Sequence, residues 1–453
     1  MPSFATPLQA QLKEFALPPG KASSLDYVRG GSIVIWFLCT VLGFWWVRDF
    51  AARLDFAAQG RYYIFYAVGL CTVGICHLTL GAKKISDVSY LPPFGDFKSG
   101  ALALFFISMA VLSPLSIAPL ESARYGIATW GVLCVAALVW RSNPRVVRLA
   151  IVATGCVVMG YLLIVLVKNG MSYGAVGGVN RNRYCSAAFA ALVCGFMTRG
   201  KLRWMIALTA ISLMVMLSSR GTLLGTFIFL FVYFAQTKQL QKVIGVFFAL
   251  GIVGLVIVLL ARGGGGKSDP ILEGVLKMSD AKRGIGSGLT GRTDRWDEGW
   301  NTFRKRPWVG YGFRTRSNDS LESKSAHSGY INLLLDTGLL GFGLLIGALT
   351  FDCLRRRKFT KTMGKFYGLS SIPPHLQPIF DVNCIAVAVY ARVALLWLLD
   401  PSYLSLGTPF NNILLMLISA PVAVLTSRAL ASDPYFAPLP PTMAYGMQMG
   451  RAG

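Results

Sequence analysis

The chain has 453 residues, of which 54% are hydrophobic and only 14% are charged, and its mean hydropathy is +0.55. Soluble proteins are charged at about a quarter of their residues, so this composition excludes an ordinary soluble protein and indicates an integral membrane protein. The formal net charge is +24, which the positive loops of membrane proteins explain, so we expect no nucleic acid partner.

Apolar stretches of membrane-spanning length recur along the chain. A spanning helix needs about 20 mostly apolar residues, and hydropathy predicts about twelve such helices in an all-α polytopic membrane fold. One long polar insert, Arg262 to Lys324, separates the ninth predicted helix from the tenth. The approximate centres of the predicted helices are Leu38, Gly69, Ala110, Leu133, Val158, Ala190, Leu208, Ile228, Gly254, Leu344, Val389 and Met416.

The predicted helices divide the chain into parts of different character. Residues 1–30 form a mildly polar segment without a recognisable cleavage site, so we expect the first helix to remain as an anchor. Residues 31–261 hold helices one to nine, residues 262–326 the insert, and residues 327–430 helices ten to twelve. The tail, residues 431–453, is rich in Pro and Met and is predicted to be flexible.

The short connections between the helices predict the orientation of the chain. With an even number of spans, both termini lie on the same side of the membrane. The connections on that side hold about twice as many Lys and Arg as the connections on the opposite side. Because positive residues are retained in the cytoplasm, this difference places both termini in the cytoplasm and the insert outside. The basic connection from Arg355 to Asp381 is then expected to face the anionic inner leaflet. The nine Cys are scattered without CxxC pairs, so we expect neither a disulfide framework nor a metal site.

Two arginine-bearing corners on the outer side are candidate anion sites. A glycine-rich link ends in Asn180–Arg181–Asn182–Arg183 at the start of the sixth predicted helix. The helix dipole favours anions there, although ordinary helix capping fits the same residues. Arg220 lies in a tight corner between two short apolar helices. An arginine this close to hydrocarbon is costly unless an anion meets it, although snorkelling to the interface would also relieve the cost.

The insert opens with a glycine-rich stretch, Ala261 to Ser268, that matches a relaxed phosphate-loop pattern. A phosphate loop needs a strand before it and a helix after it. Here a predicted membrane helix precedes the stretch and Asp269–Pro270 follows it. We therefore interpret it as a flexible exit from the membrane and expect no nucleotide.

Further along the insert, Trp296, Trp300 and Phe303 recur at spacings of four and three. This spacing predicts a short amphipathic helix that lies on the membrane face, with Arg292 at its N-terminal end and Arg295 in its first turn. The Pro- and Gly-rich turn that follows is expected to return the chain toward the candidate site that begins at Ser325.

The stretch from Ser325 to Gly341 runs from a polar turn with His327 into an apolar helix. A rotation of about 100° per residue would place Gly338 and Gly341 on the face of His327, so that another helix or an acyl chain could pass below the histidine, and Asp336 on the opposite face. A lone His at a helix mouth is a candidate for chemistry, with a helix cap as the alternative. Arg392, near the middle of the eleventh helix, must face the bundle interior or a wet cavity and is a further candidate.

The order of these motifs resembles the O-antigen ligase family: Arg220 in SSRG, then GR…W…RPWVGYG in the insert, then HSGYINLLLDTGLLG at the next helix. That family also includes O-antigen polymerases and protein O-oligosaccharyltransferases. The resemblance implies a GT-C-like glycosyltransferase of the bacterial inner membrane that takes a glycan from undecaprenyl pyrophosphate at the periplasmic face, without a metal or other cofactor. It implies His327 as the base and Arg220 and Arg292 as catalytic pyrophosphate ligands, with Arg183 and Arg181 as helpers. Apart from the resemblance, Arg295, Tyr330 and Arg392 are further candidates for substrate binding.

This chemistry suits the residue types. A pyrophosphate leaving group needs cations where negative charge grows, and Arg binds phosphate oxygens with paired hydrogen bonds. The acceptor hydroxyl needs a base, which a neutral His can provide, and direct attack would invert the anomeric centre. Within the family we expect the ligase, whose phosphorylated lipid A–core acceptor suits the basic insert. The alternatives are an O-antigen polymerase, a protein O-oligosaccharyltransferase and, from another class, a transporter, which should show broken spans in matching halves.

Overall fold

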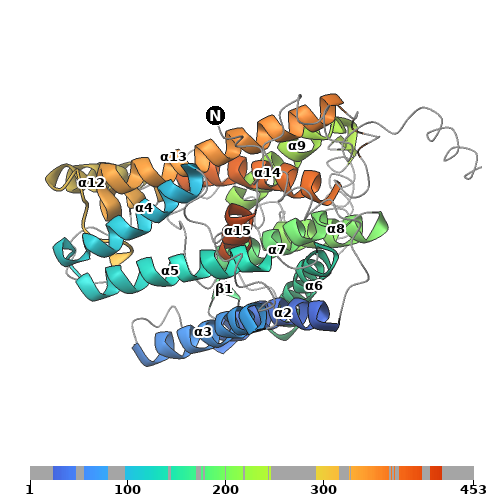
Figure 1. Cartoon of the computed structure of the whole chain (residues 1–453), viewed down its shortest axis with the longest axis horizontal. Coiled ribbons are helices and arrows are strands. Elements are labelled where there is room, and N and C mark those ends of the chain that lie inside the picture. Colours follow the sequence, from blue (N-terminus) through green and yellow to red (C-terminus); the bar gives the residue numbers. More distant parts are fainter. Residues whose placement is uncertain are drawn as a thin grey trace, which may run out of the picture.

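The computed structural model describes residues 24–46, 56–79, 97–140, 144–169, 175–176, 179–198, 200–217, 220–242, 244–245, 292–315, 326, 328–366, 369, 372, 377–399 and 409–420. Within these residues the chain is helical apart from one short hairpin (Figure 1). A short 3-10 helix, η2 (Ser113–Leu115), links α4 to α5. The helices are α2 (Ser24–Trp46), α3 (Phe56–Thr79), α4 (Phe97–Val111), α5 (Pro119–Val139), α6 (Pro144–Asn169), α7 (Arg181–Phe196), α8 (Lys201–Met216), α9 (Arg220–Gln236), α12 (Arg292–Lys305), α13 (Gly329–Phe366), α14 (Gln377–Leu399) and α15 (Pro409–Ser419).

The described helices support a multi-pass membrane protein. Val147–Val167, Gly329–Lys365 and Ile379–Leu398 are each long and apolar enough to cross a bilayer, and shorter apolar helices accompany them. Each predicted centre lies within a described helix except Gly254, which lies outside the described residues. The number of membrane crossings and the GT-C-like architecture stay predictions.

A two-residue hairpin departs from the predicted all-α fold. β1 (Ala175–Val176) pairs antiparallel with β2 (Val179–Asn180). Backbone pairing occupies these four residues of the glycine-rich link. The hairpin leads directly into α7 at Arg181.

α13 and α14 run antiparallel. Near the start of α13, the Ser328 hydroxyl donates a hydrogen bond of 3.1 Å to the Trp397 carbonyl, close to the C-terminal end of α14. Farther along α13, Arg356 Nη1 donates to Asn383 Oδ1 at 2.9 Å, close to the start of α14. The first residues of α13 therefore lie at the same end of the bundle as the last residues of α14.

α9 also runs antiparallel to α14, and α7 runs parallel to α9. Gly225, early in α9, lies against Leu396, whereas the Gln236 amide at the end of α9 donates to the Cys384 carbonyl at 3.2 Å. The N-terminal ends of α7, α9 and α13 thus share one end of the molecule. The ring contacts that set the direction of α7 are Phe189–Phe229 at 5.3 Å and Phe196–Tyr233 at 4.9 Å.

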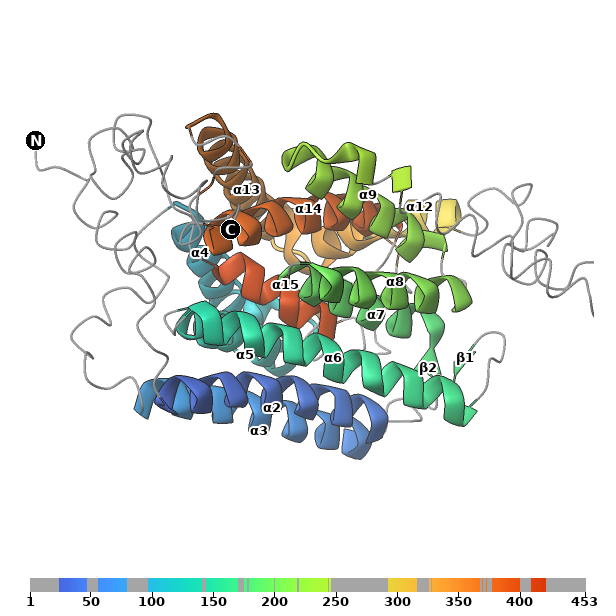
Figure 2. The ribbon, with the colours of Figure 1, turned by 90° about the vertical axis from the view of Figure 1, so that its right-hand side faces the viewer.

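The helices are stacked in layers. Figure 2 shows α2 and α3 at the bottom, α5 and α6 above them, and α9 and α13 at the top. α2 packs on both α3 and α6, and α6 packs on α7. Buried aromatic rings such as Phe189 and Phe229 fill the space between α7 and α9. Because lipid gives no hydrophobic force between helices, such close van der Waals packing stabilises the bundle.

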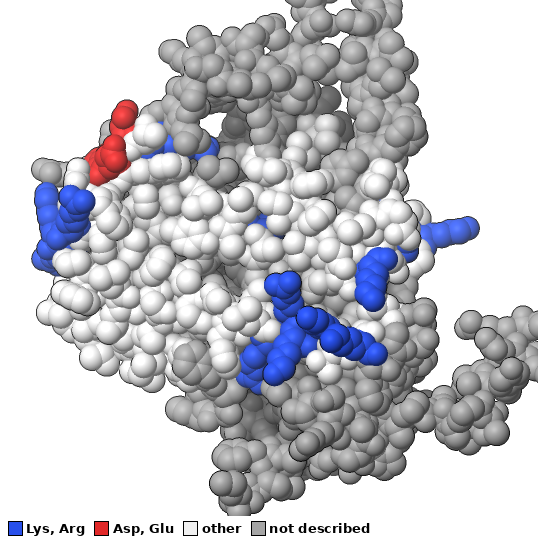
Figure 3. All heavy atoms as spheres, turned by 90° about the horizontal axis from the view of Figure 1, so that it is seen from above, with Lys and Arg blue, Asp and Glu red and all other residues white. Residues whose placement is uncertain are grey.

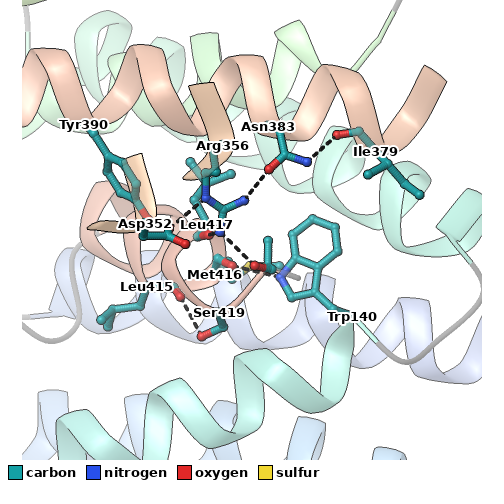
Figure 4. Close-up of polar contacts among 11 residues, drawn as sticks. Trp140, Asp352, Arg356, Ile379, Asn383, Tyr390, Leu415, Met416, Leu417 and Ser419 are labelled. Carbon is teal, nitrogen blue, oxygen red and sulfur yellow. Dashed lines mark hydrogen bonds and ion pairs between the residues drawn. The ribbon is translucent and has the colours of Figure 1, made fainter. Parts of the chain in front are cut away.

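A buried arginine joins α13, α14 and α15 (Figure 4). Arg356 is fully buried and forms an ion pair with Asp352, with 2.7 Å between Nε and Oδ2. Its other nitrogens donate to Asn383 Oδ1 at 2.9 Å and to the Leu417 and Ala420 carbonyls at 3.0 and 2.7 Å. The two carbonyls belong to the C-terminal end of α15, where the helix dipole favours a cation.

The position of Arg356 corrects the expected basic connection. α13 continues through Arg355 to Phe366, so these residues form a helix, and the helical period turns Arg356 toward the protein instead of a lipid leaflet. Figure 3 shows Lys and Arg in separate groups, one beside acidic residues at the α12 end and another away from it. The exposed basic residues of this part of α13 are Arg357, Lys358, Lys361 and Lys365.

Candidate functional site

α12 has one buried stripe along its length. Arg292 and Arg295 are half-buried, Gly299 and Phe303 are buried, and the acidic side chains of the helix are exposed. Positions three or four residues apart share a helix face, so both arginines lie on the face of the buried pair. The predicted helix is confirmed, with Arg292 as its first residue; that it lies on a membrane face stays a prediction.

The buried stripe of α12 packs on the first turns of α13. A Cβ atom at Gly299 would come within 2.8 Å of Ile331 and 3.0 Å of Ala326, so a larger residue would force the two helices apart. Phe303 packs with Ala326 and Leu335 in a small apolar cluster. The arginine-bearing helix is thereby fixed against the chain that leads into α13.

The residues on either side of His327 are buried, whereas His327 itself lies outside the described residues. The Ala326 backbone N–H donates to Asn332 Oδ1 at 3.1 Å, and the Ser328 hydroxyl donates to the Trp397 carbonyl at 3.1 Å. The chain is therefore held immediately before and after the histidine. The catalytic role of His327 is not tested by this geometry and stays a prediction.

α13 is interrupted at Gly338, which has a φ of 65° and a ψ of −171°. The Pro- and Gly-rich turn after α12 fills the interruption with backbone hydrogen bonds. The Tyr311 N–H donates to the Leu335 carbonyl at 2.8 Å, and the Leu339 N–H donates to the Pro307 carbonyl at 2.8 Å. The turn therefore lies against α13, while its expected return toward the site at His327 stays a prediction.

The interruption overturns the expected arrangement of side chains along one continuous helix. The rotation of about 100° per residue, on which that expectation rests, does not continue through Gly338, where the helix is broken. The group that approaches Gly338 is the backbone of Trp308, not another helix or an acyl chain. Asp336 is 3% exposed and accepts the Arg314 backbone N–H at 3.3 Å, so its carboxylate stabilises the turn.

Tyr330 connects α13 to α14. Its hydroxyl donates to the Ala394 carbonyl at 2.8 Å, and its ring lies edge-on to Trp397 with centroids 5.8 Å apart. These contacts are those of a helix–helix connector. The substrate-binding role of Tyr330 remains untested.

Arg392 is buried inside the bundle, with 3% of its surface exposed. Its Cζ atom lies 3.7 Å from the ring centroid of Phe189 on α7 and 4.3 Å from that of Phe410 on α15. Gly225 of α9 leaves room for it, since a Cβ there would lie 3.1 Å from Arg392 Cγ. The expectation that Arg392 faces the bundle interior is confirmed, while substrate binding by Arg392 stays a prediction.

Candidate arginines stand at the first residues of helices: Arg181 begins α7, Arg220 begins α9 and Arg292 begins α12. The first turns of α7 and α9 hold no acidic residue. A helix N-terminal end carries partial positive charge, so an arginine there is unfavourable unless an anion compensates it. The side chains of Arg181, Arg183 and Arg220 lie outside the described residues, and their roles stay predictions.

An exposed apolar band borders α12. Trp308 is 70% exposed, and Leu339 and Leu340 are 44% and 46% exposed. The Leu340 N–H donates to the Trp308 carbonyl at 3.3 Å, so these residues form one local patch. The exposed basic run from Arg304 to Arg306 ends α12 beside it. Trp beside basic residues is typical of the region between hydrocarbon and lipid headgroups.

Across the part of the chain that the structure describes, no group of three or more His, Cys, Asp or Glu side chains could hold a metal ion. The expected metal independence of the reaction is a separate matter and stays a prediction.

Residues 205–346 match the family model described as O-antigen ligase. No curated protein shows a significant match to the chain. The matched segment includes α8, α9, α12 and the first part of α13, and with them the candidates Arg220, Arg292, Arg295, His327 and Tyr330. Members of this family are glycosyltransferase-like enzymes that act on lipid-linked saccharides. The resemblance seen in the motifs is thus confirmed over residues 205–346, the segment that matches the O-antigen ligase family.

Proposed function

We propose that this protein is an O-antigen ligase. It transfers an O-antigen polysaccharide from undecaprenyl pyrophosphate to the lipid A–core oligosaccharide at the periplasmic face of the bacterial inner membrane, with both termini in the cytoplasm. The observation that carries the proposal is that the N-terminal ends of α7, α9 and α13, with α12 packed on α13, share one end of the bundle. Most of these elements lie in the segment that matches the O-antigen ligase family.

The arginines at that end hold the donor in this proposal. Negative charge grows on the pyrophosphate as the glycosyl bond breaks, and guanidinium groups bind phosphate oxygens with paired hydrogen bonds. Arg220 and Arg292 are the catalytic ligands, and Arg181, Arg183 and Arg295 add positive charge around them. The helix N-terminal ends at which several of them stand also favour an anion.

His327 acts as the general base. The acceptor hydroxyl oxygen attacks the anomeric carbon, and its proton passes to His327. The bond from that carbon to the pyrophosphate oxygen breaks, undecaprenyl pyrophosphate leaves with the electron pair, and the anomeric centre is inverted. A positioned base of this kind contributes about 10² to 10⁴ in rate, and the proposed step uses no metal and no nucleotide.

A polymerase or a protein O-oligosaccharyltransferase would use the same donor, whereas a transporter would need a different architecture. A transporter is expected to show broken spans in matching halves around a midplane site. α13 is broken at Gly338, but the turn after α12 fills that break with backbone hydrogen bonds. This arrangement favours a fixed brace over a transport gate.

The glycolipids of a deletion strain separate the candidates. Loss of a ligase leaves lipid A–core without O-chain while lipid-linked polymer accumulates, whereas loss of a polymerase leaves cores that carry one repeat. His327→Gln should fail to complement although it reaches the membrane, because an amide cannot take up the proton. His77→Ala is the control, since His77 lies in α3 and its ring nitrogen bonds to the Val73 carbonyl of the same helix, 2.9 Å away. If His327→Gln transfers glycan at the wild-type rate, His327 is not the general base.

A further inference from the structure

The chain just before His327 is anchored by a side chain from α13. The Ala326 backbone N–H donates to Asn332 Oδ1 at 3.1 Å. Ala326 is 0% exposed and Asn332 is 4% exposed. A buried backbone N–H needs a hydrogen-bond partner, and here an amide side chain from one turn inside α13 provides it.

The chain just after His327 is anchored to a different helix. The Ser328 hydroxyl, on a residue that is 3% exposed, donates to the Trp397 carbonyl of α14 at 3.1 Å. Trp397 lies in the last turn of α14, where carbonyls have no partner within their own helix. The Ser328 carbonyl in turn accepts the Asn332 N–H at 2.9 Å.

Asn332 therefore contacts both neighbours of His327, one through its side chain and the other through its backbone. Consecutive Cα atoms are about 3.8 Å apart, so two anchored neighbours restrict where the residue between them can lie. Ala326 is also seated against Gly299 of α12. The anchors thus tie this point of the chain to α12, which carries Arg292, and to α14.

We propose that Asn332 and Ser328 are positioning residues that hold His327 in register with the arginine-bearing helix α12. This inference rests on the proposed function, in which His327 takes the proton of the acceptor hydroxyl. Neither residue needs to touch the substrate. A displacement of about 1 Å in a reacting group can cost about 10²-fold in rate, so loss of an anchor lowers the rate without weakening donor binding.

The first test measures kcat and the KM for the lipid-linked donor, with full-length protein in proteoliposomes and rates expressed per folded protein. Asn332→Ala and Ser328→Ala should each lower kcat by about 10- to 100-fold, with KM changed by less than about twofold. Asn332→Asp keeps the acceptor oxygen for the Ala326 N–H and should recover most of the lost kcat. A raised KM with unchanged kcat would overturn the proposal, since it would indicate a substrate contact.

Matched controls separate positioning from a general loss of buried hydrogen bonds. Asn412 is 0% exposed and its amide donates to Thr40 Oγ1 at 3.1 Å, and the Ser419 hydroxyl donates to the Leu133 carbonyl at 3.1 Å. Asn412→Ala and Ser419→Ala should lower stability and leave kcat per folded protein unchanged. Equal kcat losses in these controls would overturn a specific role for Asn332 and Ser328.

Combination with His327→Ala decides whether the two residues act through the histidine. In that background Asn332→Ala and Ser328→Ala should add no further loss, because the group they position is gone. If each double variant has a lower kcat than His327→Ala alone, the proposal is overturned. It is also overturned if His327→Ala is inactive while Asn332→Ala and Ser328→Ala both keep the wild-type kcat. A fully active His327→Ala would instead overturn the base assigned in the proposed function.

Discussion

Two buried arginines are accommodated in different ways. Around Arg356 stand a carboxylate, an amide oxygen and the carbonyls at the end of α15. Arg392 instead lies between the rings of Phe189 and Phe410, whose π faces attract a cation. The hydrogen bonds of Arg356 make it a brace between three helices, distant in sequence from the candidate site.

Arg356→Ala should destabilise the protein strongly. Loss of one partner of a buried ion pair leaves Asp352 uncompensated, which costs about 3–5 kcal/mol. Arg357 is exposed, and Arg357→Ala should change the free energy of unfolding by less than about 0.5 kcal/mol. Thermal unfolding in detergent, followed with a dye that reacts with cysteines as they become exposed, measures both variants. Equal unfolding temperatures would contradict the role given to Arg356.

Arg292→Lys should lose most of the transfer activity, because an ammonium group cannot bind pyrophosphate with the paired hydrogen bonds of a guanidinium. The same loss is expected for Arg220→Lys. Arg304→Lys is the control on the same helix, since Arg304 is exposed and lies over Trp300, 5.9 Å from the ring centroid. The measurement is polymer attached to lipid A–core in membranes with equal protein. Near-normal activity of Arg292→Lys and Arg220→Lys would reduce these residues to helix-end anchors.

Among the elements, the pair of α12 and α13 forms the structural unit of the candidate site. α12 packs on the first turns of α13, and the turn after α12 inserts its backbone into the interruption at Gly338. The N-terminal piece of α13 is thus held on two sides by the segment that precedes it in the chain. A change in this turn should therefore alter the site without touching any candidate side chain.

Gly338→Ala should destabilise the protein by about 1–3 kcal/mol from backbone strain alone, since its φ is 65°. A Cβ there would also lie 2.2 Å from the Trp308 carbonyl oxygen. Gly343 is the matched control in the same helix, because a Cβ there would meet nothing within 4 Å. Gly343→Ala should leave stability unchanged or raise it by up to about 1 kcal/mol. Unfolding temperatures in detergent compare the two, and a tolerated Gly338→Ala would contradict the interruption.

Elements with a local pattern were predictable from the sequence, and those that depend on distant partners were not. The spacing of Trp296 and Phe303 gave the correct helix, with Arg292 at its start. Apart from Asp352, the hydrogen-bond partners that surround Arg356 lie 27 to 64 residues away, and the break at Gly338 depends on the backbone of another segment. The role of Asn332 was not predicted, because its side chain accepts a hydrogen bond from a backbone N–H and such a contact has no sequence pattern.

The molecule as a whole has two different ends. One end holds the starts of α7, α9 and α13 together with α12, and the other holds Arg356 and the exposed basic residues that follow it on α13. Positive residues are retained on the cytoplasmic side of membrane proteins, so the predicted orientation places the α12 end outside.

Thr293→Cys on α12 and Lys361→Cys on α13 should report opposite sides of the membrane, since both positions are exposed. In a background without the native cysteines, an impermeant thiol reagent should label Thr293→Cys in cells with a permeabilised outer membrane. Lys361→Cys should react only after the inner membrane is opened. The reverse pattern would invert the orientation, and labelling of both positions across an intact inner membrane would contradict their separation.

The exposed band of Trp308, Leu339 and Leu340 has a consequence for reaction kinetics. If this band sets α12 at the depth of the lipid headgroups, the donor pyrophosphate and the acceptor reach the protein by diffusion in a plane and not from bulk water. The effective concentrations of donor and acceptor are then set by the number of molecules per unit area of membrane. Added inert phospholipid would slow the reaction at constant enzyme and substrate, and turnover in the cell would follow the composition of the membrane surface instead of the volume of the periplasm.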